Sequence, residues 1–214
     1  MAIVTVSRMS GAGGEEVAQR VASALGWPLL DNAVVDEVAA RLSVTREQVT
    51  AREERVSSLA ERLANAMLLG APESFSPQAR DDQPPPTEQQ VVEMTRRVVT
   101  EAVQRGPAVL VGRGTQCVLA DRADALHVFC FAAPAALAAR LSELRGVSLP
   151  EAARIAEEEN RNRQQYVKRH WGRDWRAIEN YHLCLDSGRL GIEEVARIVT
   201  EAARVKFGMA ARVP

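Results

Sequence analysis

The sequence predicts an α/β fold in which parallel strands form a central sheet between layers of helices. Short, continuously apolar runs alternate with helical patterns, and the first run leads directly into a glycine-rich turn. Four runs have the length of strands buried on both faces, and they cover residues 2–6, 108–111, 126–131 and 182–185. Because helices separate these runs, the strands must pair in parallel through crossovers, which gives an α/β sandwich.

The helices between the strands have readable ends. Capping residues or a proline mark their starts, and glycines mark their stops. The predicted starts are Thr87, Pro134 and Ser148, and the predicted stops are Gly26, Gly106 and Gly146. A last amphipathic helix is predicted over residues 192–205.

The composition predicts one domain with an ample core and excludes several classes of function. The 214 residues are 46% apolar, and the formal net charge of −1 gives no electrostatic basis for binding nucleic acid or a membrane surface. No apolar run approaches the roughly 18 residues that span a bilayer. The three cysteines form no CxxC pair, and their odd number favours a reducing compartment. We therefore expect a cytoplasmic protein.

Residues 33–69 depart from the alternation, because they have helical periodicity without a clear strand. Three interpretations are open: a helix packed on its own domain, a lid-like insertion, or a face through which two copies of the chain form a homodimer. The candidate dimer segment is 46–69. The proline-rich stretch 70–87 predicts a mobile loop between helices.

The turn after the first strand, SRMSGAGGEEVA at residues 7–18, has the setting of a phosphate-binding loop. A strand followed at once by a glycine-rich turn and a helix directs backbone N–H groups and the positive end of the helix dipole at one spot. The general motif G-x-x-x-x-G-K-[ST] fits poorly, because Arg8 takes the first glycine position, Gly14 the lysine position and Glu15 the hydroxyl position. A tight strand–helix turn without a ligand is the competing interpretation.

The missing lysine raises the question of which group supplies positive charge. Only two of the 27 basic residues are lysines, Lys168 and Lys206, so the N-terminal two thirds of the chain offers arginine alone. Arg8, inside the loop, is the nearest candidate, because a planar guanidinium donates two hydrogen bonds to two phosphate oxygens. Glu15 and Glu16 lie where a phosphate would collect charge, yet acidic residues in the first turn of a helix are also ordinary dipole partners.

Two further groups of arginines are candidates for anion binding. Arg113 follows the strand 108–111 between two glycines, at the sheet edge where ligands bind in open parallel sheets; phosphate binding and simple solvation both fit it. The tract 157–177 combines basic and aromatic residues near a possible helix end at Gly172. Such a tract suits either a solvated helix face or a lid that closes over polyphosphate.

Together, these motifs resemble the cytidylate-kinase-like proteins, a branch of the P-loop nucleoside monophosphate kinases. The branch opens with I-S-R-x-x-G-S-G-G, matched here by VSRMSGAGG at 6–14, and the similarity continues through 26–39, 109–119 and 180–199. The resemblance spans nearly the full chain, and it makes the missing lysine a property of the branch. It implies a P-loop NTPase-type three-layer α/β/α fold with a helical nucleotide-binding insertion at 33–105 and an arginine-rich lid at 157–177.

The resemblance also implies an activity and the residues that serve it. Cytidylate kinases transfer the γ-phosphoryl group of ATP to CMP or dCMP with Mg²⁺. By position, Asp31 and Arg113 would bind the acceptor nucleotide. The residues that would hold the donor are Ser10, Gly11, Ala12, Gly13, Gly14 and Glu15, and the cations on the transferring group would be Arg8, Arg140, Arg161 and Arg163.

One departure keeps other functions open. Glu15 stands where the branch often has a basic residue, so the metal ligands are undefined, and Ser10 is either a metal ligand or an ordinary loop hydroxyl. One alternative is a non-catalytic nucleotide or anion sensor with a degenerate loop. Another is an ATP-dependent kinase of a different small phosphate acceptor.

Overall fold

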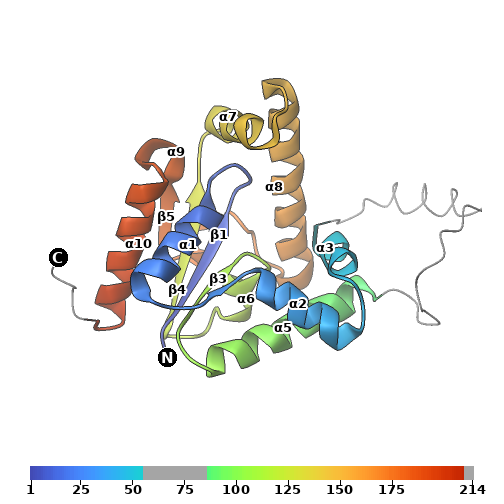
Figure 1. Cartoon of the computed structure of the whole chain (residues 1–214), viewed down its shortest axis with the longest axis vertical. Coiled ribbons are helices and arrows are strands. Elements are labelled where there is room, and N and C mark those ends of the chain that lie inside the picture. The colour runs from blue at the N-terminus through green and yellow to red at the C-terminus, as the bar shows by residue number, and fades with distance from the viewer. Residues whose placement is uncertain (55–85, 210–214) are drawn as a thin grey trace, which may run out of the picture.

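A five-stranded, wholly parallel sheet forms the centre of the protein in a computed structural model, which describes residues 1–54 and 86–209 (Figure 1). The strand order is β2-β3-β1-β4-β5. The strands are β1 (Ile3–Arg8), β2 (Leu29–Leu30), β3 (Ala108–Val111), β4 (Ala125–Phe131) and β5 (Leu183–Asp186). The four strands predicted from apolar runs are therefore confirmed to within two residues at each end, and the α/β class with them.

The helices follow the predicted caps closely. Thr87 and Gln90 form a reciprocal capping box, and Gly26, Gly146 and Gly172 each cap a helix in the left-handed conformation. The helices are α1 (Gly14–Leu25), α2 (Asn32–Leu42), α3 (Arg46–Glu54), α5 (Glu88–Gln104), α6 (Thr115–Val118), α7 (Pro134–Arg145), α8 (Leu149–Trp171), η1 (Ile178–Asn180), α9 (Ser187–Leu190) and α10 (Ile192–Lys206).

One predicted helix end was wrong. The helix that begins after Thr87 ends at Gln104, with Arg105 as its C-cap, rather than running to Gly106. The N–H of Arg105 bonds the carbonyl of Ala102 in a tight last turn, so the helix closes before the glycine is needed.

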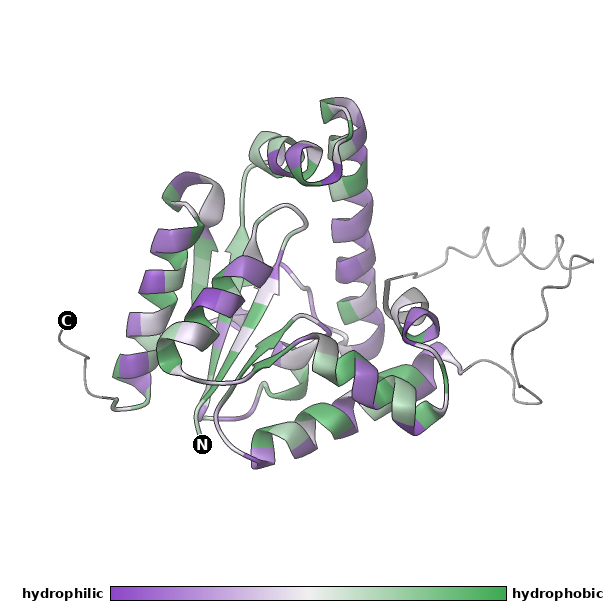
Figure 2. Cartoon of the chain, viewed as in Figure 1, coloured by the Kyte–Doolittle hydropathy of each residue, from purple (hydrophilic) through white to green (hydrophobic). Residues whose placement is uncertain are grey.

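Strand alternation divides the core between the two faces of the sheet. Val4 and Val6 pack with α1 and α10 on one face, while Ile3 and Leu110 pack with α2 and α5 on the other. Figure 1 shows these helices as the outer layers, which confirms the three-layer arrangement. The sheet is apolar in Figure 2, as a sheet covered on both faces should be.

Helix α8 lies beyond the carboxyl edge of the sheet, where it is joined to α7 (Figure 1). Near its start, Ala152 and Ala156 belong to the core under α1; near its end, Tyr166 and Val167 pack with Phe129 of β4. The helix is mainly hydrophilic between these two ends (Figure 2). Its polar middle therefore faces the edge where a ligand of an open parallel sheet would bind.

Several predictions concern residues outside the described part of the chain. Residues 70–85 of the predicted mobile loop and residues 55–69 of the candidate dimer segment lie outside the described residues. In the part that is described, Val34, Val38 and Val49 are buried against the same sheet face as α5. None of the helices in the described ranges is long and apolar enough to cross a membrane.

Candidate active site

The glycine-rich loop joins β1 to α1 at the carboxyl edge of the sheet. The N–H of Met9 continues the β4 pairing by bonding the carbonyl of Cys130 at 2.9 Å, and the loop then turns through Gly13, whose φ of 68° makes it the N-cap of α1. As a glycine, Gly13 has no side chain with which to cap the helix. The N-terminal N–H groups of α1 are thus left to a ligand or to solvent, as in an anion site at a helix start.

Two glycines make room for the side chain of Arg8. A Cβ on Gly14 would lie 2.3 Å from Cβ of Arg8, and a Cβ on Gly112 would lie 2.2 Å from its Nη1. Arg8 therefore runs from the start of α1 to the loop after β3. Gly14 occupies the position of the lysine in the general motif. The side chain of Arg8 packs beside it, and a larger residue than glycine at position 14 would clash with Arg8.

Carboxylates in the first turn of α1 hold two arginines. Nη2 of Arg8 lies 2.6 Å from Oε1 of Glu15, and Arg140, from α7, pairs with Glu16. Partial burial opposes the ionisation of Glu15, but the charge and hydrogen bond of Arg8, with Arg163 behind it, outweigh that effect and hold its pKa below the ordinary value. Both arginines thus stay at the helix start, where a phosphate would bind.

Helix α8 is bonded directly to the loop. The N–H of Ser10 donates to Oδ1 of the buried Asn160 at 2.7 Å, and Nη1 of Arg163 donates to the carbonyl of Arg8 at 2.9 Å. The hydroxyl of Ser10 donates to the carboxylate of Glu159. The arginines of α8 are therefore positioned relative to the loop by at least three hydrogen bonds.

The Ser10–Glu159 pair has the chemistry of a magnesium site. Mg²⁺ binds oxygen ligands and is commonly held by one or two protein groups together with phosphate oxygens and water. A hydroxyl and a carboxylate in contact beside a phosphate loop fit that donor set, but Arg145 bonds Oε1 of Glu159 at 2.7 Å, so an ion there would compete with this arginine for the carboxylate. In the described ranges no group of three or more His, Cys, Asp or Glu residues forms a metal cage, so the pair would hold the ion only together with its phosphates.

Arg113 has an unusual backbone. Its φ is 53°, and the glycines on either side are also left-handed, with φ of 64° and 67°. Residues other than glycine rarely adopt this conformation. The guanidinium lies 3.7 Å from Oδ1 of Asp31, at the end of β2, and burial lowers the pKa of Arg113 against the opposing charge of Asp31. The turn therefore holds the guanidinium of Arg113 at the sheet edge, where it faces Asp31.

A cavity of about 370 Å³ lies between this edge and α8. The sheet side contributes Ser7, Arg8, Gly112, Arg113 and Gly114, with Gln116 from α6. The α8 side contributes Glu158, Glu159, Asn162, Arg163, Tyr166 and Val167. The volume is within the usual range for small-molecule sites, roughly 300–1,000 Å³. Arginines from both walls make it suitable for an anion.

The comparison with protein families agrees with this geometry. A model described as the cytidylate kinase-like family matches residues 3–189. The chain belongs to the cytidylate kinase-like family. Membership of this kinase-like family supports a phosphotransferase, and its members generally use ATP and Mg²⁺. A search of curated proteins found no match.

Solved structures similar to this family member share its fold. An uncharacterised protein from Eubacterium ventriosum ATCC 27560 is 16% identical, with a TM-score of 0.68 and a match that covers 95% of this chain and 98% of that one. A gluconokinase from Sinorhizobium meliloti 1021 is 13% identical, with a TM-score of 0.51 and 98% of each chain covered. A shikimate kinase from Bacteroides thetaiotaomicron is 15% identical, with a TM-score of 0.50 and coverage of 94% and 97%. The P-loop kinase fold is thus confirmed.

The structure brings most of the predicted site residues of this cytidylate kinase-like protein to one edge of the sheet. The loop residues, Arg8 and Arg163 lie together, Arg140 approaches Gly13, and Arg113 meets Asp31. Arg161 is the exception, because it is exposed on α8 and does not line the cavity. The functional roles of these residues stay predictions.

Sequence reasoning missed several groups that the site contains. Glu159 and Asn160 hold the loop, and Gln116 lines the cavity. A helical wheel of α8 would have found part of this set, because its cavity-lining residues recur every three or four positions from Ile155 to Val167. Glu159 belongs to this periodic set, whereas Asn160, which bonds the loop from the neighbouring position, does not and had no such signal.

Proposed function

We propose that the protein transfers the γ-phosphoryl group of ATP to a nucleoside monophosphate, with CMP or dCMP as the first candidates. The observation that carries the proposal is the position of Arg8, which reaches from the glycine-rich loop to the cavity. A cation that joins a donor loop to an acceptor cavity is what phosphoryl transfer requires, because that reaction depends on positioning and charge stabilisation more than on a protein nucleophile.

In this proposal the two phosphates approach from opposite sides of Arg8. The donor lies over the N–H groups of the loop and the start of α1, and the acceptor phosphate lies in the cavity against Arg113. Arg8, Arg140 and Arg163 then neutralise the transferring group. The protein supplies no general base, because an oxygen of the acceptor phosphate already carries negative charge.

Ion pairing in the structure implies an exchange of partners. Arg8 is bonded to Glu15 and Arg140 to Glu16. Each of these glutamates is bonded through a single guanidinium nitrogen, whereas a phosphate group can bond both ends of the planar fork. Bound nucleotide would therefore displace the glutamates. Mg²⁺, which Ser10 and Glu159 would hold, would neutralise part of the charge of the bound phosphates.

The same pairing supports the alternative function. A sensor that binds a nucleotide without turnover has no need to release its arginines from Glu15 and Glu16, and the missing lysine suits slow or absent transfer. The family's P-loop kinase fold also serves kinases of acceptors other than nucleotides, as the names of the similar shikimate kinase and gluconokinase indicate. A test must therefore vary the acceptor widely.

A coupled assay of ATP consumption across common nucleoside mono- and deoxymonophosphates tests the proposal. We expect turnover with CMP or dCMP in the presence of Mg²⁺ and none without an acceptor. Shikimate and gluconate serve as non-nucleotide acceptors in the same assay. Measurable ATP binding without turnover of any acceptor would remove the enzyme and leave the sensor.

A further inference from the structure

The lining of the cavity includes two polar groups that form no hydrogen bond within the described residues. Oε1 of Gln116 and the hydroxyl of Tyr166 are buried and have no hydrogen-bond partner within residues 1–54 and 86–209. The two residues are only 3% and 5% exposed. Buried polar groups are nearly always paired, and leaving one unpaired is costly. Two such groups on the wall of one cavity therefore indicate that a ligand pairs with them.

Gln116 is fixed in place by the turn that carries Arg113. The hydroxyl of Thr115 donates to the carbonyl of Gly112 at 2.9 Å, and α6 begins immediately at Thr115. Gln116 is thus in the first turn of a short helix whose start is tied to β3. Its amide is held three residues from the guanidinium that we assign to the acceptor phosphate.

Tyr166 reaches the cavity from the opposite side, on α8. Its ring packs edge-on against Trp171, with 5.4 Å between ring centroids, and the indole of Trp171 lies over Gly114, where a Cβ would come within 2.4 Å of it. Burial raises the pKa of Tyr166, so its oxygen stays a hydroxyl that both donates and accepts.

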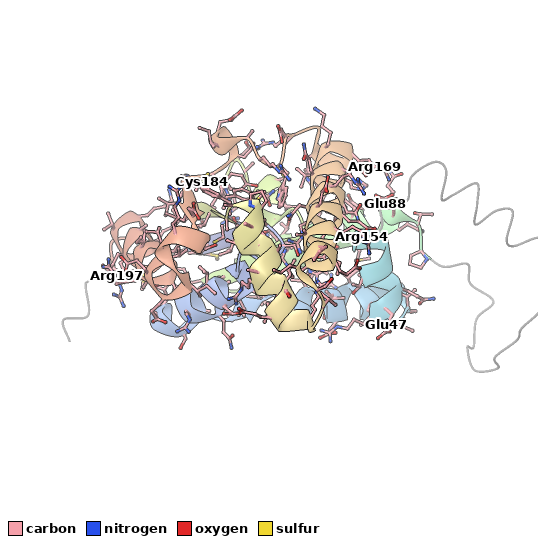
Figure 3. The ribbon with its side chains drawn as sticks, turned by 90° about the horizontal axis from the view of Figure 1, so that it is seen from above. Glu47, Glu88, Arg154, Arg169, Cys184 and Arg197 are labelled. Carbon is pink, nitrogen blue, oxygen red and sulfur yellow. The ribbon has the colours of Figure 1, made fainter. Side chains whose placement is uncertain are left out.

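The far end of α8 is anchored as well. Glu88, at the start of α5, bonds Arg169 and the ring of His170, each at 2.8 Å. Figure 3 shows Glu88 and Arg169 side by side at this end of the helix. Because Tyr166 is one turn before these residues, its position on the cavity wall is set by packed neighbours on both sides.

We propose that Gln116 and Tyr166 recognise the base of the acceptor, with Oε1 of Gln116 accepting a hydrogen bond from an exocyclic amino group. This inference rests on the proposed function, since it places the acceptor phosphate at Arg113. The remaining wall suits a flat ring, because Ile155, Val167 and Trp175 supply apolar contacts. Since the proposed acceptor is CMP or dCMP, the base expected there is cytosine.

Loss of the amide is expected to remove the preference for an amino group. We expect wild-type protein to favour CMP over UMP at least tenfold, both in equilibrium binding measured by calorimetry and in kcat/KM. Gln116→Leu, which keeps the size and removes both polar atoms, should bring CMP down to the level of UMP. Tyr166→Phe should weaken both acceptors while the KM for ATP stays unchanged.

Gln104→Leu is the matched control, because Gln104 is exposed at the end of α5 and lies away from the cavity. It should behave as the wild type. Calorimetry measures the binding of CMP and UMP even without turnover. The proposal on base recognition can therefore be tested independently of the proposal on phosphoryl transfer. Turnover of CMP with an unchanged preference in Gln116→Leu would overturn the inference and leave the proposed function standing. If Gln116→Leu fails to fold, an equal affinity of the wild type for CMP and UMP would overturn the inference alone.

Discussion

Replacing Arg8 with alanine is expected to lower kcat by about 10² to 10³-fold, while the KM values for ATP and acceptor change much less. Losing one preorganised charge-stabilising donor has an effect of this size in other enzymes. The reason here is geometric: Arg8 lies between the start of α1 and the cavity, where charge would develop on the transferring group. Steady-state kinetics with each substrate varied in turn measure the separation of kcat from KM.

Two further variants make the Arg8 result specific. Arg8→Lys keeps the charge but loses the planar fork, so it should recover only part of the rate. Arg197→Ala is the control, because Arg197 pairs with Glu194 on the exposed face of α10, away from α8 (Figure 3). If Arg8→Ala keeps a wild-type kcat and its fold, then another residue replaces the lysine.

Replacing Arg113 with alanine is expected to raise the KM for the acceptor by about 10 to 100-fold and to leave the KM for ATP nearly unchanged. Hydrogen bonds to charged groups contribute about 1.5–3 kcal/mol, which corresponds to that range. Arg113 lines the cavity wall opposite α8 and also faces Asp31, so its loss removes an acceptor contact and leaves Asp31 without this partner.

The Arg113 variant is expected to change the KM for the acceptor, whereas the Arg8 variant is expected to change kcat. Arg122→Ala provides the control, because Arg122 pairs with Asp124 at the opposite edge of the sheet. Arg113→Lys should fall between alanine and the wild type, since lysine keeps the charge without the fork. An equal rise in the KM for ATP and for the acceptor would show that Arg113 does not distinguish the two sites.

Local sequence was enough to predict most of the fold. The strand Ala108–Val111 was predicted to the residue, and the capping box at Thr87 was recognised from the spacing to Gln90. Both follow from interactions between residues close in the chain. The end of α5 was missed because Gly106 was taken as the cap, whereas the tight last turn makes Arg105 the C-cap and leaves Gly106 one position beyond it.

The site was harder to predict, because it depends on contacts between distant segments. The sequence did not predict that the side chain of Arg8 fills the space beside Gly14. The path of this side chain also depends on Gly112, which is about 100 residues further along the chain. Glu159 and Asn160 bond Ser10 across about 150 positions of the chain, and only the rotation of α8 about its axis decides which of its acidic residues reaches the loop. Such pairings are tertiary information.

Arginines are proposed to take the place of the loop lysine during phosphoryl transfer. A crystal structure with ADP, Mg²⁺, aluminium fluoride and CMP tests this claim most directly. We predict that guanidinium groups of Arg8, Arg140 and Arg163 lie within hydrogen-bond distance of the fluorides and have left Glu15 and Glu16. Arginines that remain on those glutamates while Lys168 or another cation contacts the fluorides would contradict the claim.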